Sequence, residues 1–410
     1  MRGSEPESSY AWLRLLASLA LSSLGGVAMY GVVVVLPQLE REFGVARADA
    51  SMPYALTMLG FGAGGILMGR LADRFSAMVP VIVGTLGLGA GLILAGSASS
   101  ILQFGIAHGL LAGLLGCSAT FAPLIADTSL WFTRRRGIAV AIVSSGNYLA
   151  GAAWPPVLQY FFETAGWRAT YTGVGIFCVA VMLPLAVVLR RRPPMLASAP
   201  TAAQVERSQR PLGLSSNALM GLLCIAGVAC CVAMSMPQVH IVAYCSDLGY
   251  GAARGAEMLS VMLGAGIVSR LASGWICDRI GGLRTLMLGS ALQGIALFLF
   301  LPFDGLVSLF VVSGLFGLFQ GGIVPAYAII IREFFSPREA GTRVSVVLMA
   351  TLVGMAFGGW ISGAIFDWTG SYRAAFLNGI GWNLLNLSIA FWLLRRSVSI
   401  PPTAAPAFLR

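Results

Sequence analysis

The stretch Gly69-Arg-Leu-Ala-Asp-Arg74 ends a long apolar segment, and a close variant of it, Gly274-Trp-Ile-Cys-Asp-Arg279, ends another one 205 residues later. The same offset separates Arg168 from Arg373, each of which stands just before a further apolar segment. Several matches at one offset predict that the chain consists of two repeats. In membrane proteins built from such repeats, the binding site lies between them, near the middle of the bilayer.

Composition places the chain in a membrane. It has 410 residues, of which 57% are hydrophobic and only 10% are charged, whereas a soluble domain carries about 25% charged residues. All 26 basic residues are arginine, which excludes a mechanism based on a reactive lysine. The 7 cysteines lie in or beside apolar runs, without a CxxC spacing. We interpret them as packing residues rather than as disulfides or metal ligands.

Twelve segments are apolar over the roughly 20 residues that a helix needs to cross a bilayer. The sequence therefore predicts an all-α membrane protein with twelve transmembrane helices. These fall into an N-terminal half, 1–190, and a C-terminal half, 217–410, joined by a polar linker, 191–216. The first segment is too long for a cleaved signal sequence. The predicted helices cover residues 12–36, 50–71, 78–97, 101–126, 137–161, 169–189, 217–245, 254–276, 284–303, 306–331, 344–366 and 373–394.

The arginines orient the chain in the membrane. With the N-terminus in the cytoplasm, 20 of them fall on the cytoplasmic side and 5 on the outer side. Because cytoplasmic loops are enriched in basic residues, we expect a multi-pass protein with both termini in the cytoplasm. The same asymmetry accounts for the net charge of +10 without nucleic acid as a partner.

The remaining arginine, Arg270, lies inside the apolar segment Met258–Ile276. A guanidinium near the middle of a membrane helix costs roughly 2.5–3.5 kcal/mol on insertion scales, and arginine cannot lose its charge. Such a residue is kept where it faces a water-filled cavity and meets an anion or a fixed partner. We therefore predict that the protein binds something negatively charged. The alternative is a structural ion pair with one of the few acids near the spans, Asp73, Asp127, Glu257 or Asp278.

The two repeated turns carry a second prediction. Gly69 and Gly274 allow close helix approach, Asp73 and Asp278 can cap a neighbouring helix, and Arg74 and Arg279 can form ion pairs across the cytoplasmic face. Such contacts would stabilise one conformation of the protein and would be broken in the other. With this pair of turns, the chain resembles the major facilitator superfamily. The resemblance implies two pseudo-symmetric six-helix bundles. The first copy departs from the family pattern at Ser76, and the alternative for both is an ordinary charged helix end.

The segment Trp131-Phe-Thr-Arg-Arg-Arg-Gly-Ile-Ala-Val-Ala-Ile-Val-Ser-Ser-Gly146 resembles the helix 4–5 signature of the monocarboxylate porter family. In Ser269-Arg270-Leu-Ala-Ser-Gly274 the arginine also has the place that this family gives to an arginine in helix 8. The resemblance implies that Arg270 binds the carboxylate of the substrate. A guanidinium fork matches a carboxylate bidentately, which lysine cannot do.

Two departures from this family narrow the expectation. Proton-coupled animal members have an aspartate four residues before the arginine, where this chain has Gly266, and the usual start of helix 1 is replaced by Tyr10-Ala-Trp12. The chain thus looks more like bacterial relatives of the oxalate and monocarboxylate type, in a bacterial inner membrane. The eleventh predicted span, 344–366, contains no cation. A single central charge favours a substrate with a single carboxylate.

Other polar residues within the spans are predicted to complete the site. They would orient the rest of the substrate, and the alternative for each is a hydrogen bond between helices. His240 and Glu257 are the candidates for proton coupling, although Glu257 can equally be an exposed acid paired with Arg254. The predicted substrate-binding residues besides Arg270 are Tyr30, Asn147, Tyr148, His240, Gln320 and Tyr327.

These observations predict a secondary transporter of small organic monocarboxylates, proton-coupled and working by alternating access. Alternatives of the same fold are an exchanger of organic anions or dicarboxylates and a drug exporter, which would favour acidic residues in its cavity. An enzyme is disfavoured because the sequence has no nucleophile–base arrangement, no GxxxxGK[ST] loop and no zinc-ligand cluster. We expect no cofactor and no metal.

Overall fold

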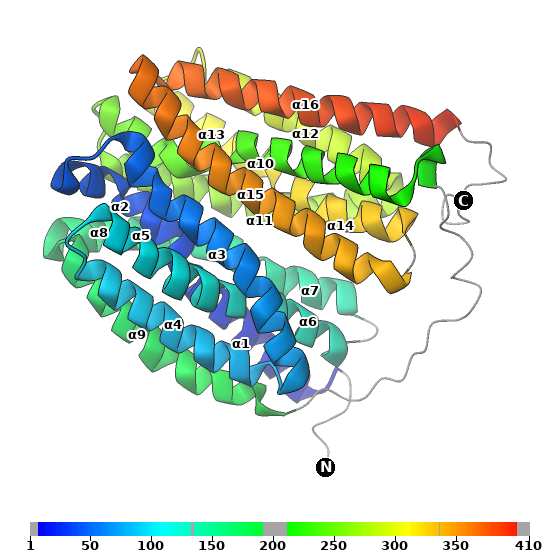
Figure 1. Cartoon of the computed structure of the whole chain (residues 1–410), viewed down its shortest axis with the longest axis horizontal. Helices are drawn as coiled ribbons and strands as arrows, with labels where there is room; N and C mark the ends of the chain where they lie inside the picture. Colours follow the sequence, from blue (N-terminus) through cyan, green and yellow to red (C-terminus); the bar gives the residue numbers. More distant parts are fainter. Residues whose placement is uncertain (1–6, 133–134, 192–210, 336, 400–410) are drawn as a thin grey trace.

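The computed structural model describes residues 7–132, 135–191, 211–335 and 337–399, and the regular structure in these ranges is helical (Figure 1). Twelve of its helical segments are long and apolar enough to cross a membrane. This confirms the predicted number of spans. The helices run beyond the apolar segments at several ends. For example, α2 (Val27–Phe43) continues through Glu40, Arg41 and Glu42, because backbone hydrogen bonding within a helix does not depend on side-chain polarity.

The first half contains six spans. The first consists of α1 (Ser9–Gly25) and α2, the second of α3 (Arg47–Arg74) and the third of α4 (Met78–Gly96). The remaining three are composed of α5 (Ile101–Ile106) with a π-helix (Ala107–Cys117) and α6 (Ala122–Trp131), then α7 (Arg136–Ser144) with α8 (Gly146–Ala165), then α9 (Trp167–Val187) with a short 3₁₀ helix (Val188–Arg190).

The second half repeats this order. Its spans are α10 (Ser216–Asp247), α11 (Ala252–Ile280), α12 (Gly282–Leu299), α13 (Leu306–Gln320) with α14 (Ile323–Phe334), α15 (Pro337–Thr369) and α16 (Tyr372–Ser399). A 3₁₀ turn, Pro211–Gly213, precedes it. Most of the predicted linker 191–216 lies outside the described residues, as do residues 1–6 and 400–410, so the boundaries of the halves stay a prediction.

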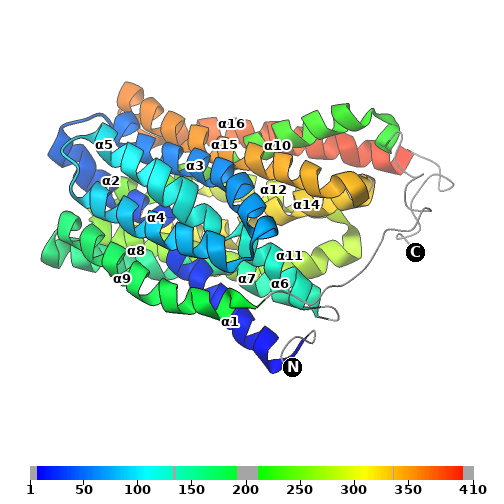
Figure 2. The same cartoon turned by 60° about the horizontal axis from the view of Figure 1, so that its bottom comes forward.

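The two halves form two layers of helices in Figure 1, with α3 of the first half beside α15 of the second. The start of α1 and the end of α16 lie toward the same end of the molecule (Figure 2). We call this end the terminal side, and it is the side predicted to be cytoplasmic. We call the opposite end, where α2 ends and α3 begins, the distal side.

Glycines bring equivalent helices of each half together. A Cβ on Gly64 of α3 would collide with the backbone oxygen of Leu114 in the fourth span, and a Cβ on Gly317 of α13 would collide with the backbone oxygen of Met262 in α11. Both are contacts between the second and fourth span of a half. Small residues permit this backbone approach between membrane helices, which explains why both halves need glycine at this crossing.

A buried ion pair fixes the first half. The Arg14 guanidinium donates two hydrogen bonds of 2.7 Å to the Asp127 carboxylate, and the two side chains are only 2% and 6% exposed. Trp131 lies against the same guanidinium, with its ring centroid 5.0 Å from Cζ. The pair connects α1 with α6. Asp127 was one of the possible acidic partners of Arg270 in the sequence analysis, and in the structure it binds Arg14 instead.

Replacing Asp127 with alanine should destabilise the protein, because Arg14 would stay buried without its anion. Removing one partner of a buried pair typically costs about 3–5 kcal/mol. We expect a clearly lower thermal midpoint for the purified protein in detergent, followed by tryptophan fluorescence. Asp73→Ala, which removes an exposed carboxylate, is the control. Equal midpoints for the two variants would contradict this account.

Candidate functional site

Arg270 lies at the boundary between the two halves. It belongs to α11, and its side chain is half-buried. Its Nη1 donates a 3.0 Å hydrogen bond to the backbone oxygen of Ser144 in the first half, and its Nε lies 3.5 Å from the backbone oxygen of Gly321 in the second. The ring centroid of Tyr148 lies 4.3 Å from its Cζ. The predicted anion-binding residue therefore joins elements of both repeats.

The backbone oxygens around Arg270 are available because two spans are interrupted beside it. The fifth span breaks at Ser145, between α7 and α8, and the tenth breaks at Gly321 and Gly322, between α13 and α14. The last backbone oxygens of a helix lack partners within it and carry partial negative charge. Arg270 thus meets the C-terminal ends of two helices, an arrangement that stabilises a cation without a formal anion.

Among the described residues, no carboxylate lies within ion-pairing distance of Arg270. Asp127 pairs with Arg14, and Glu257 pairs with Arg254 at 2.7 Å. Asp73 and Asp278 are exposed at the terminal side. The positive charge of Arg270 is therefore not balanced by an acid in the part of the chain that the structure describes.

Three of the predicted residues lie on α2 and α8 of the first half, and one of them, Tyr148, contacts Arg270. The ring of Tyr148 covers its guanidinium, and Tyr30 of α2 reaches α8 so closely that a Cβ on Gly151 would lie 2.6 Å from its Cζ. The preceding residue on α8, Asn147, is half-buried, with its Nδ2 3.7 Å from the sulfur of Met29. These side chains bring hydroxyl and amide groups to the first-half side of the boundary at which Arg270 lies.

Gln320 joins this group from the second half. It directly precedes Gly321, and its Oε1 accepts a 3.0 Å hydrogen bond from Nε2 of Gln238. Its own Nε2 is buried and has no partner among the described residues. Gln238 was not singled out from the sequence, because a lone amide in a long apolar helix gives no sign of which way it points.

Two other predicted residues lie elsewhere. Tyr327 is fully buried, and its hydroxyl donates a 2.9 Å hydrogen bond to Asn386, which in turn donates to Ser290 at 2.7 Å. This chain stays within the second half. Glu257 is exposed on α11 and bonded to Arg254, which is the alternative that the sequence left open for it.

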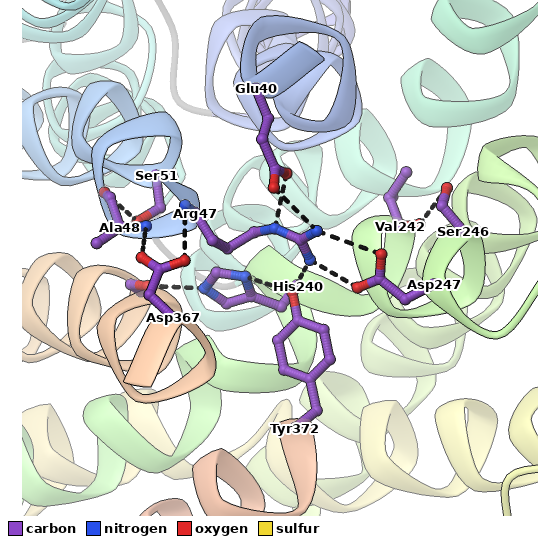
Figure 3. Close-up of polar contacts among 11 residues, drawn as sticks. Glu40, Arg47, Ala48, Ser51, His240, Val242, Ser246, Asp247, Asp367 and Tyr372 are labelled. Atoms are coloured by element: carbon purple, nitrogen blue, oxygen red, sulfur yellow. Dashed lines mark hydrogen bonds and ion pairs between the residues drawn. The ribbon is translucent and has the colours of Figure 1, made fainter. Parts of the chain in front are cut away.

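His240, the remaining predicted residue, belongs to a cluster on the distal side that crosses between the halves (Figure 3). The cluster is centred on Arg47 at the start of α3, and its guanidinium binds Asp247 of α10 at 2.8 Å and Glu40 of α2 at 2.7 Å. It also donates to the hydroxyl of Tyr372 on α16. We call this the Arg47 cluster; its members are Glu40, Arg47, His240, Asp247, Asp367 and Tyr372.

Asp367 contributes a second connection. Its carboxylate accepts hydrogen bonds from the backbone N–H groups of Arg47 (2.9 Å) and Ala48 (2.8 Å). A carboxylate at this position satisfies free N–H groups at a helix start and meets the positive end of the helix dipole. The helix start that it caps belongs to the other half of the protein, because Asp367 lies near the end of α15. The halves are thus joined by both side-chain and backbone contacts.

His240 extends the Arg47 cluster toward the membrane interior. Its Nε2 lies 2.7 Å from the backbone oxygen of Gly359 on α15 and its Nδ1 lies 3.2 Å from the Tyr372 hydroxyl. Since a backbone oxygen only accepts, Nε2 carries the proton in this arrangement and Nδ1 accepts from Tyr372. The histidine therefore links α10, α15 and α16 and does not contact Arg270.

The repeated turns on the terminal side are not engaged in the same way. The side chains of Asp73, Arg74, Asp278 and Arg279 are exposed, and no ion pair joins them to another described residue. A Cβ on Gly69 or Gly274 would meet nothing within 4 Å. The helix cap at this end comes instead from Glu333, which accepts a 2.9 Å hydrogen bond from the Gly282 N–H at the start of α12.

Two six-helix halves that are joined on the distal side, with Arg270 at their boundary, have the architecture of membrane transporters built from repeats. The family model of the Major Facilitator Superfamily matches residues 16–313 and 258–409. The chain belongs to this superfamily, which confirms the expected fold and the class of membrane transporter rather than enzyme.

Curated relatives of this chain are also named as membrane transporters. The chain is 28% identical to Monocarboxylate transporter 13 of Rattus norvegicus, covering 92% of this chain and 87% of the relative. It is 26% identical to Monocarboxylate transporter 11 of Homo sapiens, covering 91% and 80%. The resemblance to the monocarboxylate porter family is thereby confirmed. These relatives are animal proteins, and the expectation of a bacterial membrane stays a prediction.

Solved structures show the same fold at low identity. A bacterial homolog to the human lysosomal transporter Spinster matches with a TM-score of 0.72 and 16% identity, covering 98% of this chain and 99% of that one. The peptide transporter POT in complex with sulfate matches with a TM-score of 0.74 and 12% identity, covering 96% of each chain.

Replacing Arg47 with glutamine should loosen the distal side, because the variant keeps a polar side chain but loses the charge that binds Asp247. We expect the backbone amides of residues 44–54 and 363–376 to exchange hydrogen at least about 10-fold faster, the scale of losing a hydrogen bond to a charged group. Exchange measured by mass spectrometry on the purified protein tests this. Arg254→Gln, which removes an exposed distal arginine, is the matched control. Unchanged exchange in the Arg47 variant would mean that the cluster does not hold the halves together.

Proposed function

We propose that this protein is a secondary transporter of small organic monocarboxylates, and that the substrate carboxylate binds Arg270. The observation that carries this proposal is a charged guanidinium at the boundary between the halves, held by backbone oxygens and an aromatic ring but by no described carboxylate. A half-buried cation without an acid beside it is suited to bind an anion, because charge-assisted hydrogen bonds are strongest when both partners are ionised.

The same observation supports a substrate with one carboxylate. Arg270 has five N–H groups in a fixed fork, of which two are directed at backbone oxygens. The remaining three are sufficient for one bidentate carboxylate. The polar groups of Tyr30, Asn147 and Gln320 would then hydrogen-bond the rest of the molecule, as hydroxy or keto groups next to the carboxylate require. Since Tyr327 and His240 contact other parts of the protein, we leave them out of this proposed set.

Transport in this proposal proceeds by alternating access. The Arg47 cluster joins the halves on the distal side, while the turns at Asp73 and Asp278 make no ion pair with another described residue on the terminal side. This pattern supports a state in which the site communicates with the terminal side, which we place in the cytoplasm from the arginine asymmetry. Opening the distal side requires the Arg47 cluster to separate, and the exposed turns are then free to bind across the terminal face.

Uptake of labelled lactate, pyruvate, 2-hydroxyisobutyrate and oxalate into proteoliposomes tests the proposed function. We expect a monocarboxylate to be transported, and we expect uptake at low substrate concentration to fall about 10- to 100-fold in Arg270→Gln. That range corresponds to the loss of a hydrogen bond to a charged group, worth about 1.5–3 kcal/mol. Arg270→Lys should also be impaired, because an ammonium cannot form the bidentate pair.

Arg254→Gln, on the same helix but exposed and paired with Glu257, is the matched control and should transport normally. Normal transport by Arg270→Gln would contradict carboxylate binding at this residue. Comparing uptake with and without an inward proton gradient tests the proposed proton coupling. Oxalate taken up in preference to all three monocarboxylates would favour the dicarboxylate exchanger.

A further inference from the structure

We propose that Gly266 is a positioning residue for Arg270, because its lack of a side chain lets the Tyr148 ring lie against α11 and over the guanidinium. The inference rests on the proposed function, since it names a residue that shapes the same site. A Cβ built on Gly266 would lie 2.5 Å from Cδ1 of Tyr148 and still closer to Cε1. No side chain fits at this position while the ring stays where it is.

The ring connects Gly266 with Arg270 along one face of α11. Residues four apart lie above one another on a helix, so a ring that packs on Gly266 reaches the side chain of Arg270 in the next turn. The distance of 4.3 Å from the Tyr148 ring centroid to the Arg270 Cζ is that of a cation–π contact. Tyr148 thus packs directly against the guanidinium of Arg270.

The backbone of Gly266 is also packed against the end of α13. A Cβ on Gly321 would be only 2.5 Å from the backbone oxygen of Gly266. Gly321 is the residue whose own backbone oxygen lies 3.5 Å from the Nε of Arg270. Two glycines therefore bring α8, α11 and the end of α13 together, and Arg270 contacts Tyr148 of α8, Gly321 at the end of α13 and Ser144 at the end of α7.

A side chain at 266 would displace the Tyr148 ring, and the guanidinium would lose the surface that holds its plane. A carboxylate would then bind a cation with more freedom to move, and the fixed geometry of the fork would be lost. We expect the cost to fall on substrate affinity rather than on the conformational cycle, because Gly266 does not contact the Arg47 cluster. A phenylalanine at 148 would present the same ring face without the hydroxyl, so this substitution separates the contribution of the ring from that of the hydroxyl.

A double-mutant cycle in proteoliposomes tests this, with KM and maximal rate measured for the monocarboxylate that the wild type transports. We expect Gly266→Ala and Tyr148→Ala each to raise KM about 10-fold, in the range of a desolvated cation–π contact, with little change in maximal rate. Because both substitutions remove the same contact, the KM of the double variant should not exceed the higher of the two single-variant KM values. Tyr148→Phe keeps the ring and loses only the hydroxyl, so it should raise KM less than Tyr148→Ala does.

Gly264→Ala is the matched control on the same helix, because a Cβ there would meet only Ala152, at 3.9 Å. Its KM should not change. If Gly266→Ala alone does not fold, the double variant still has room for the added methyl group, and its KM should equal that of Tyr148→Ala. A KM well above that of Tyr148→Ala in the double variant would overturn the proposal, since Gly266 would then act independently of the ring.

The outcomes separate this inference from the proposed function. If Arg270→Gln loses transport but Gly266→Ala keeps the wild-type KM, the carboxylate site stands and the positioning role of Gly266 is wrong. If Arg270→Gln transports normally, the proposed function fails and this inference fails with it.

Discussion

The structure depends on how a permanent charge is accommodated inside an apolar helix. Arg270 cannot become neutral, and the described residues place no acid beside it, so its charge is balanced by dipoles. The backbone oxygens of Ser144 and Gly321 come from two interrupted spans, and the ring of Tyr148 adds a third partial negative surface. Dipoles compensate a charge less completely than an ion pair does. The cation therefore remains able to attract an anion from solution.

The repeat makes this arrangement possible but does not duplicate it. Spans 4 and 10 are both interrupted, before α6 and before α14, and the second and fourth spans of each half cross on glycine. At the offset of 205 residues, however, the counterpart of Arg270 is Gly65, where a Cβ would meet nothing within 4 Å. The frame of the site is symmetric, whereas its charge belongs to the second half alone. In the proposed site, an anion would consequently be held by one half and covered by the other.

Hydropathy predicted twelve spans, and one recurring offset predicted the repeat, because both are properties of local composition. The insertion cost of arginine singled out Arg270 for the same reason. The contacts of Tyr327 and His240 could not be predicted, since a polar residue in an apolar helix looks alike whether it faces a cavity or a neighbouring helix. The Arg47 cluster was missed because its members are distant in sequence and meet only in one arrangement of the halves. Gly266 stood out in the sequence only as a missing aspartate, and the ring that occupies its space comes from another helix.

In the proposed transport cycle, substrate binding and conformational change would be connected through the charge of Arg270. Enclosing Arg270 alone, away from water, would leave its charge compensated only by dipoles, which is costly in an apolar interior. An anion that pairs with it removes most of that cost, so the closed arrangement is favoured by the substrate through its differential affinity for the two states. The Arg47 cluster contributes in the opposite sense, because its ion pairs and the Asp367 cap must be broken before the distal side can open. In a cycle of this kind, the free energy needed to break the distal contacts determines how much binding free energy the substrate must provide at Arg270.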